Sequence, residues 1–238
     1  WGLRGVRGGT GPTYEELVET EGRPRLRAWL DRLLSAGVLA HAAIVYGYFP
    51  CVSDGDSLIV LQEPRPDAPE RTRFTFPRQR RDRRLCLADF YRPRELALAT
   101  GEVDVLPVHL VTMGQPIADY ANELFARDAY RDYLEVHGLG VQLTEALAEY
   151  WHRRIREELR YADQDPDDIE DYFKLRYRGA RFSLGYGACP NLEDRAKIVD
   201  LVEPDRIGVK LSEEFQLHPE QSTDAIVAHH PEAKYFNA

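Results

Sequence analysis

The order in which apolar patterns follow one another constrains the fold of this chain more than any other feature of its sequence. Residues 42–49 (AAIVYGYF) and 57–62 (SLIVLQ) are short, β-branched and aromatic, as strands are, and residues 54–56 (DGD) between them are a turn signal. Helical periodicity governs long segments before and after this pair. Because strands and helices occur in blocks and not in regular βαβ alternation, we expect an α+β fold, a single domain with a mostly antiparallel, twisted sheet flanked by helices.

The first helical segment covers residues 13–35. Thr13 and Glu16 have the spacing of a capping box, which satisfies backbone N–H groups at the start of a helix. Gly22 and Pro24 are residues that interrupt helices, and Pro removes a backbone donor. We therefore expect one helix that begins after Thr13 and divides into two pieces near Gly22.

The two strongest helical patterns span residues 117–136 and 143–161. Gly138 and Gly140 lie between them and are expected to end the first helix. In the second helix, four apolar residues are predicted to form one buried stripe opposite a charged face. These residues are Ala146, Tyr150, Ile155 and Leu159.

Four further segments are predicted to be strands. Residues 74–76 continue the first pair, and residues 103–111 (VDVLPVHLV) are expected to lie at an edge or a bulge because Pro107 cannot donate to a ladder. Residues 207–211 and 225–228 are short apolar segments near the end of the chain. Together these segments supply enough strands for one sheet.

Composition limits the classes of function. The chain has 238 residues, of which 43% are hydrophobic, and its net charge of −9 argues against nucleic acid as the main partner. Its apolar runs are all shorter than the roughly 18–20 residues that span a membrane, so we expect no membrane partner. Cys51, Cys86 and Cys189 lie far apart, so the spacing predicts neither a disulfide framework nor a structural zinc site but a reducing, cytoplasmic setting.

The ends of the chain and its division into domains are also read from the sequence. Residues 1–12 are rich in glycine and cationic, and they lack the G-K-[S/T] of a phosphate loop, so we interpret them as a flexible lead-in. Residues 13–238 are expected to form one domain. The chain starts at Trp1 with no initiator Met and no secretory leader, and we expect it to be a fragment of a longer protein.

Residues 71–94 contain nine arginines within this acidic chain. One interpretation is a solvated surface on which the arginines pair with nearby carboxylates. The other is a docking patch for an acidic partner, because opposite surface fields steer association. The interruption of the run by aromatic and apolar residues favours the first interpretation.

The segment 178–191 (RGARFSLGYGACPN) is the best candidate for a functional site. It has neither helical nor alternating periodicity, and we interpret it as a loop whose backbone approaches another molecule, since glycine has no Cβ to block such an approach. An arginine in such a loop offers a planar pair of donors that suits a carboxylate. The alternative is a glycine-rich connection with one salt-bridged arginine.

The R-x-x-x-G-Y pattern at 181–186 and the Ala-Cys-Pro at 188–190 resemble the signature of the activation domain of cobalamin-dependent methionine synthase. Further segments are similar to this family in the same order along nearly the whole chain. They are LCLADF at 85–90, EALAEYWH at 145–152, KLSE at 210–213 and HPEAKYF at 230–236.

The resemblance implies a specific function. Domains of this family bind S-adenosylmethionine and support reductive remethylation of cob(II)alamin to methylcobalamin, as part of a methyltransferase of methionine biosynthesis. The cobalamin belongs to a neighbouring domain of the same polypeptide, and zinc belongs to another module. The usual electron donor is a flavodoxin-type protein, which gives the arginine-rich segment a candidate partner. The isolated chain is not expected to make methionine, and no catalytic base or metal ligand is expected in it.

The resemblance also implies roles for individual residues. Arg181 matches the family's ligand-binding arginine and should pair with the methionyl carboxylate. Glu145 matches a helix carboxylate near the ammonium group or ribose, and Tyr235 with Phe236 matches a second aromatic contact near the adenine or the sulfonium. Two loop residues, Ser183 and Gly185, are expected to contribute backbone groups.

Tyr186 follows the loop glycine and should face the cobalamin, although a half-buried loop tyrosine is the ordinary alternative. Two departures limit the carry-over. The family's upstream aspartate would precede Trp1, so we expect weaker binding by this chain than by a longer one. Leu192 stands where the family can have a histidine, so a polar role there does not transfer.

Two other functions are alternatives. A self-contained methyltransferase of the doubly wound type needs a glycine-rich loop directly after its first strand, and YGYFPCVSDGD lacks that pattern. A protein-interaction module that docks a flavodoxin-type partner without its own small ligand would use the arginine-rich segment as its main surface. Stabilisation by S-adenosylmethionine that is lost in Arg181→Ala would support the activation domain, whereas no stabilisation of the intact protein would favour the interaction module.

Overall fold

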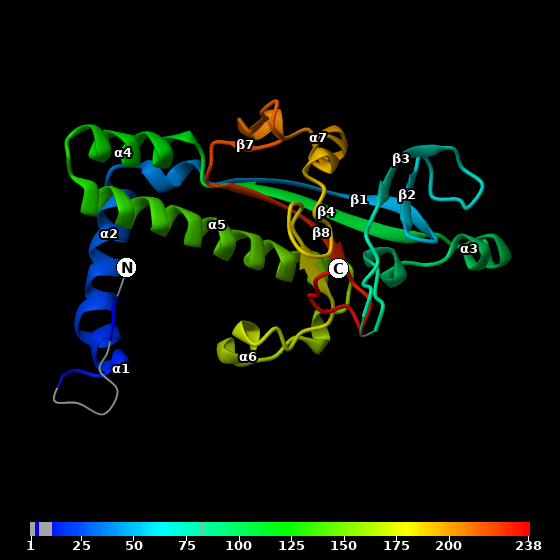
Figure 1. Ribbon diagram of the computed structural model, residues 1–238, viewed down its shortest axis with the longest axis horizontal. Coiled ribbons are helices and arrows are strands. Elements are labelled where there is room, and N and C mark those ends of the chain that lie inside the picture. Colours follow the sequence, from blue (N-terminus) through cyan, green and yellow to red (C-terminus); the bar gives the residue numbers. More distant parts are fainter. Residues whose placement is uncertain (1–2, 5–10, 82) are drawn as a thin grey trace.

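The computed structural model describes residues 3–4, 11–81 and 83–238 and has a six-stranded sheet at its centre (Figure 1). The strand order is β3-β2-β1-β4-β8-β5, and every pairing within it is antiparallel. The strands are β1 (Ala43–Asp54), β2 (Ser57–Leu61), β3 (Glu70–Thr75), β4 (Asp104–Thr112), β5 (Ala180–Phe182) and β8 (Ser222–Ala228). This arrangement confirms the predicted α+β class and excludes the doubly wound parallel alternative.

The hairpin β1–β2 forms where the sequence predicts it. Asp54 pairs with Ser57 across the turn, and Gly55 has a φ of 57°, a left-handed conformation that glycine adopts without steric cost. Strand β1 is longer than predicted, because it continues through Pro50 to Asp54 and pairs with β4 over the first part of its length. A second, two-stranded sheet joins β6 (Lys210–Leu211) to β7 (Leu217–His218).

The prediction that Pro107 places its strand at an edge is wrong, because β4 lies between β1 and β8. Pro107 pairs with Tyr48 of β1, whereas the ladder with β8 begins one residue later, at Val108. A proline can therefore occupy this central strand because one of its two neighbours has not yet begun to pair with it.

The long helix α5 (Tyr130–Glu158) lies along one face of the sheet (Figure 1). It runs without interruption through Gly138 and Gly140, so the predicted break at these residues is wrong. A Cβ at Gly140 would lie 3.0 Å from Gln221 Cγ and 3.1 Å from Ile117 Cδ1, so this glycine lets the helix pack closely against its neighbours. The two helices are instead separated earlier in the chain, between the end of α4 (Gln115–Ala126) and the start of α5 at Tyr130.

The N-terminal helical segment projects from one end of the sheet and begins with the predicted capping box at Thr13 (Figure 1). It consists of α1 (Tyr14–Leu17), a π-helical turn over Val18–Gly22, and α2 (Arg23–Ser35), so the predicted division near Gly22 is a change of helical geometry. Glu135 of α5 is buried and anchors α2, because it accepts a hydrogen bond of 2.7 Å from Trp29 Nε1 and pairs with Arg25.

The remaining helices are short. They are α3 (Arg94–Thr100), α6 (Ile169–Phe173) and α7 (Arg195–Val202). The Asp168 side chain caps α6, and the Asn191 side chain caps the 3₁₀ turn that leads into α7. No helix among the described residues combines the length and the apolar character that a bilayer crossing requires.

The sheet separates an apolar layer from a more polar one. Val108 and Leu110 of β4 belong to the apolar core that also contains Ile198 and Leu201 of α7. His109 lies between them and, by the alternation of a strand, faces the opposite side, where α5 packs. The predicted lead-in at residues 1–12 falls largely on residues 1–2 and 5–10, which lie outside the described part of the chain.

Candidate functional site

Arg181 lies on the edge strand β5, where it is paired with Val227 of β8. The prediction that the whole segment 178–191 is a loop is therefore wrong for its first part, since Ala180–Phe182 is a strand. Edge position gives the guanidinium access to solvent on one side, and its side chain is 19% exposed. Strand geometry fixes the Arg181 backbone more firmly than a loop would.

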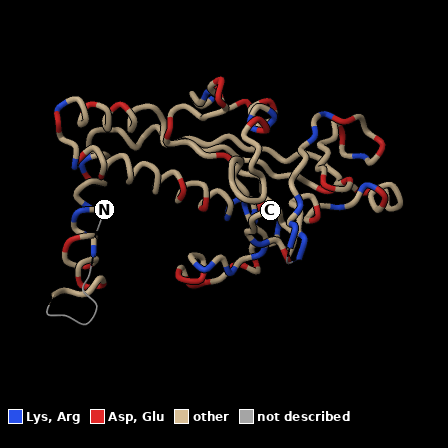
Figure 2. Tube along the Cα trace, viewed as in Figure 1, with Lys and Arg blue, Asp and Glu red and all other residues tan. Residues whose placement is uncertain are grey.

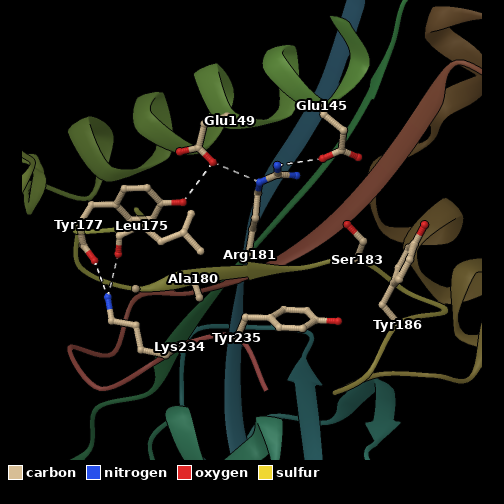
Figure 3. A pocket seen from close by; sticks show the side chains of 11 residues that line it. Glu145, Glu149, Leu175, Tyr177, Ala180, Arg181, Ser183, Tyr186, Lys234 and Tyr235 are labelled. Carbon is tan, nitrogen blue, oxygen red and sulfur yellow. Dashed lines mark hydrogen bonds and ion pairs between the residues drawn. The ribbon is translucent and has the colours of Figure 1, made fainter. Parts of the chain in front are cut away.

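Two carboxylates of α5 face Arg181 across the gap between helix and strand (Figure 3). Glu145 and Glu149 are four residues apart and so share one face of the helix. Arg181 Nη2 donates to Glu145 Oε2 over 2.9 Å, and Arg181 Nε donates to Glu149 Oε2 over 3.4 Å. One guanidinium thus bridges two acids, of which Glu145 is the more exposed.

The second carboxylate has a further partner within the fold. The Tyr177 hydroxyl donates to Glu149 Oε2 over 3.1 Å, and the tyrosine side chain is buried. Lys234, from the C-terminal segment, donates to the backbone carbonyls of Tyr177 and Leu175 over 2.9 Å and 3.2 Å. These contacts join α5, β5, the segment before β5 and the C-terminal segment around one point.

A pocket of about 350 Å³ opens beside this group. Tyr235 and Tyr186 contribute exposed aromatic rings, with 52% and 61% of each residue accessible, and Ser183 adds a hydroxyl (Figure 3). The pocket therefore combines one guanidinium, two carboxylates, hydroxyl groups and aromatic faces. Such a lining suits a ligand that has a carboxylate, an amino group and a flat ring.

A buried ion pair between Arg195 and Asp224 fixes the loop that contains Ser183 and Tyr186. Arg195 Nε donates to Asp224 Oδ2 over 2.8 Å, and Asp224 Oδ1 accepts the Leu184 backbone N–H over 3.0 Å. Burial raises the pKa of Asp224, while Arg195 and the Leu184 N–H act in the opposite direction. These bonds explain how a glycine-rich loop keeps one shape.

The structure brings together five of the seven residues that the sequence analysis selects for the site. Arg181, Glu145, Ser183, Tyr186 and Tyr235 all line the pocket. The other two, Phe236 and Gly185, do not line it.

Phe236 is buried and packs edge-on against Phe90 and Phe182. Gly185 has a φ of 90°, and a Cβ there would lie 2.6 Å from Leu192 Cδ2. The leucine that stands in place of a histidine thus packs against the loop glycine.

Three pocket residues with polar side chains were not selected from the sequence: Glu149, Tyr177 and Lys234. The spacing of Glu149 from Glu145 is a signal that could have identified it, because residues four apart lie on the same helix face. Tyr177 has no such signal, since its role depends on how the segment before β5 folds back onto α5.

Polar side chains are buried beneath the pocket, between α5 and the sheet. His109 and His152 are fully buried, and their ring nitrogens have no hydrogen-bond partner among the described residues. Burial lowers the pKa of His109 to about 3, and Arg181 adds a repulsion in the same direction. Burial also lowers the pKa of His152, and the charge of Arg156 contributes.

Because His109 and His152 are buried and have lowered pKa values, we predict that acid destabilises the fold. In the unfolded chain they bind protons below a pH of about 6.5, whereas the folded protein keeps them neutral, so stability falls as the pH drops from about 6.5 towards 3. At pH 5, His109 alone lowers the free energy of unfolding by about 2 kcal/mol relative to pH 7.5. Urea unfolding at both pH values measures this loss. His109→Phe should reduce it, whereas the control His41→Gln at an exposed position should not; equal losses in all three proteins would contradict the assignment.

The cysteines and histidines form no metal site within residues 3–4, 11–81 and 83–238, where no group of three His, Cys, Asp or Glu side chains is arranged to hold an ion. Cys51, Cys86 and Cys189 are buried and unlinked. Burial raises the pKa of Cys189 to about 12, with the charges of Asp224 and Asp194 adding to the effect. This thiol therefore remains protonated, and its Sγ donates to the Ser183 carbonyl over 3.1 Å.

The arginine-rich segment is largely a surface of internal ion pairs. Among the described residues, five of its arginines bind carboxylates of the same chain: Arg71, Arg73, Arg78, Arg83 and Arg92. Figure 2 shows basic and acidic residues close together in this part of the molecule. The structure therefore supports the first interpretation of this segment, a salt-bridging surface.

Comparisons with known proteins agree on one family. A family model described as "Vitamin B12 dependent methionine synthase, activation domain" matches residues 26–238. The chain is 74% identical to methionine synthase of Mycobacterium tuberculosis (strain ATCC 25618 / H37Rv) and 70% identical to that of Mycobacterium leprae (strain TN). Both alignments cover 100% of this chain but 20% of the relative, so the chain spans about a fifth of the length of these curated relatives.

A solved structure is similar as well. It is described as "Crystal Structure of the MetH Reactivation Domain bound to AdoHcy", where AdoHcy is S-adenosylhomocysteine. The match has a TM-score of 0.82 and 27% sequence identity, and it covers 95% of this chain and 72% of that chain. The similarity therefore extends over nearly the whole fold.

Proposed function

Because the chain belongs to the family of activation domains of vitamin B12-dependent methionine synthase, we propose that its pocket binds S-adenosylmethionine and presents the methyl group to a cobalamin held elsewhere in the same polypeptide. The observation that carries this proposal is the placement of Arg181 between two carboxylates at the mouth of an open pocket. The similar solved domain, which binds S-adenosylhomocysteine, supports the choice of ligand.

The amino-acid end of the ligand fits the charged side of the pocket. Its carboxylate would bind the guanidinium of Arg181, a charge-assisted contact that is among the strongest hydrogen bonds in proteins. Arg181 would then exchange its bond to Glu145 for the ligand, since Glu145 has a side chain that is 50% exposed and free to move. The released carboxylate would meet the ligand's ammonium group or its ribose hydroxyls.

The aromatic side of the pocket fits the remainder of the ligand. Tyr235 presents an exposed ring that would hold the adenine or lie near the sulfonium, which is attracted by the negative face of a ring. Phe236 would not touch the ligand, because it is buried in the core. It would support Tyr235, its neighbour in the chain. Ser183 would contribute a hydroxyl or backbone group, and Gly185 would shape the loop without touching the ligand.

The cobalamin would approach over Tyr186, whose exposed ring stands at the rim of the pocket. Cobalamin supplies, when bound, a reduced cobalt that accepts the methyl group. The chain's contribution is to bind, orient and shield the donor, and a methyl transfer of this kind needs no general base from it.

A flavodoxin-type electron donor is a further proposed partner. The arginine-rich segment, residues 71–94, would provide the basic surface that an acidic protein approaches. The internal ion pairs of that segment reduce its free charge, so the attraction would depend on the remaining arginines, such as Arg80 and Arg81. An acidic partner steered in this way binds more weakly as salt increases.

Titration calorimetry with S-adenosylhomocysteine tests the proposed function. We expect one binding site, and at a ligand concentration 100 times the Kd the free energy of unfolding should rise by about 2.7 kcal/mol. Methylthioadenosine, which lacks the amino-acid end, should bind more weakly because it cannot reach Arg181. Absence of both heat and thermal shift would instead favour an interaction module without a small ligand.

A further inference from the structure

We propose that Tyr177 is the positioning residue of this pocket, which aims Arg181 through Glu149 and thereby sets the preference for ligands that carry a carboxylate. The inference rests on the proposed function and deepens it, because it names the residue behind the specificity for the amino-acid end of the ligand. Tyr177 itself would not contact that carboxylate. Its hydroxyl acts indirectly, through the hydrogen bond that it donates to Glu149.

The contacts around Glu149 carry the first step. Its Oε2 receives two donors, the hydroxyl of Tyr177 at 3.1 Å and Nε of Arg181 at 3.4 Å (Figure 3). The Glu149 side chain is 30% exposed, whereas that of Glu145 is 50% exposed. Glu145 can therefore give up its bond to Arg181 when a ligand carboxylate binds. Glu149 stays in place because the Tyr177 hydroxyl also holds it.

Two side chains of α5 pack against the ring of Tyr177. The guanidinium carbon of Arg156 lies 4.1 Å from the ring centre, and the His152 ring meets it edge-on at 5.2 Å. Arg156 is fully buried and bound to Asp165 over 2.8 Å, so the group that covers the tyrosine cannot swing away. Burial, with Glu149 adding to it, raises the pKa of Tyr177, so the hydroxyl remains a donor at neutral pH.

The backbone of the same residue reaches the other side of the pocket. The Tyr177 carbonyl accepts a hydrogen bond of 2.9 Å from Lys234 Nζ. Tyr235, which follows Lys234 in the chain, lines the pocket. The side chain of Tyr177 thus sets the charged wall, and its backbone ties down the segment that bears the aromatic wall. Only the first of these two connections depends on the hydroxyl group.

A guanidinium that is already aimed loses less conformational freedom when the ligand binds, which favours binding. Without the Tyr177 hydroxyl, Glu149 can rotate and Arg181 can follow either acid. The loss should affect only the part of the ligand that Arg181 contacts. Removal of this hydroxyl should therefore weaken ligands with a carboxylate and spare ligands without one.

Tyr177→Phe tests the inference by calorimetry with two probes. We expect the affinity for S-adenosylhomocysteine to fall about tenfold, while the affinity for methylthioadenosine changes less than about twofold. Tyr172→Phe is the matched control, since its hydroxyl bonds Asp165 over 3.1 Å in the same network but does not reach Glu149. That control should keep the ratio of the two affinities unchanged.

The possible results separate this inference from the proposed function. Equal weakening of both probes in Tyr177→Phe, or no weakening of either, overturns the positioning role. If the variant does not fold, Glu149→Gln takes its place, because it keeps the shape but removes the charge that orients Arg181. Glu149→Gln should lower the affinity for S-adenosylhomocysteine relative to that for methylthioadenosine. An unchanged ratio of these two affinities overturns the inference. If Arg181→Ala also leaves the ratio unchanged, the proposed function itself fails.

Discussion

Replacing Arg181 with alanine is expected to weaken the binding of S-adenosylhomocysteine about 100-fold, or by about 2.7 kcal/mol. The substitution removes a charge-assisted contact, which contributes about 1.5–3 kcal/mol. It also leaves Glu145 and Glu149 facing the ligand's carboxylate without the cation between them. Both effects act in the same direction. Calorimetric titration of the variant measures the loss.

Two controls make the Arg181 result specific. Arg153→Ala removes a cation from the same helix as Glu149, at a 56% exposed side chain that does not line the pocket, and should change the affinity less than about twofold. Methylthioadenosine should bind Arg181→Ala nearly as well as it binds the unaltered protein. If Arg181→Ala binds S-adenosylhomocysteine normally, the carboxylate is held elsewhere and the assignment of this pocket is wrong.

Replacing Asp165 with asparagine should lower the free energy of unfolding by about 3–5 kcal/mol, because it leaves a buried cation without its counter-charge. Arg156 is fully buried, and the Asp165 side chain is 6% exposed. Two nitrogens of Arg156, Nη1 and Nη2, have no hydrogen-bond partner among the described residues, so the aspartate is its main compensation. Chemical denaturation measures the change.

The neighbouring Asp163 provides the comparison, since it is exposed. Asp163→Asn should alter the free energy of unfolding by less than about 0.5 kcal/mol, as is usual for exposed positions. A similar small effect of Asp165→Asn would show that the buried pair does not stabilise the fold, and that the cation above Tyr177 is fixed by other means.

Local signals in the sequence predicted local structure well. The capping box at Thr13 and the turn at residues 54–56 are both confirmed, because each depends on a few neighbouring residues. The block order of helices and strands also predicted the fold class correctly. These features do not depend on which distant segments meet.

Features that depend on distant contacts were predicted poorly. Gly140 looks like a helix stop but allows close packing against Gln221 and Ile117, and Pro107 occupies a central strand because the β8 ladder begins after it. Two members of the predicted apolar stripe of α5, Ala146 and Tyr150, are exposed.

The buried face of α5 instead contains His152 and Arg156. Periodicity assigns polar side chains to the surface, so it could not predict a buried cation whose partners lie in other segments.

The candidate site was predicted in part for the same reason. The resemblance to a family selected Arg181, Glu145 and Tyr235, which the fold does bring together at one pocket. It did not select Tyr177, whose contribution comes from a hydrogen bond to Glu149 and a backbone bond to Lys234. A short motif identifies residues that touch a ligand, whereas the residues that orient them become visible only when the segments are packed.

A crystal structure of the chain grown with S-adenosylmethionine is the most direct test of the central claim. We expect a ligand in the pocket, with its carboxylate on the guanidinium of Arg181 and its base beside Tyr235. We also expect that Glu145 has turned away from Arg181, while the bond between Glu149 and Tyr177 is retained. A ligand bound in another hollow, or a pocket that stays empty at saturating ligand, would contradict the account.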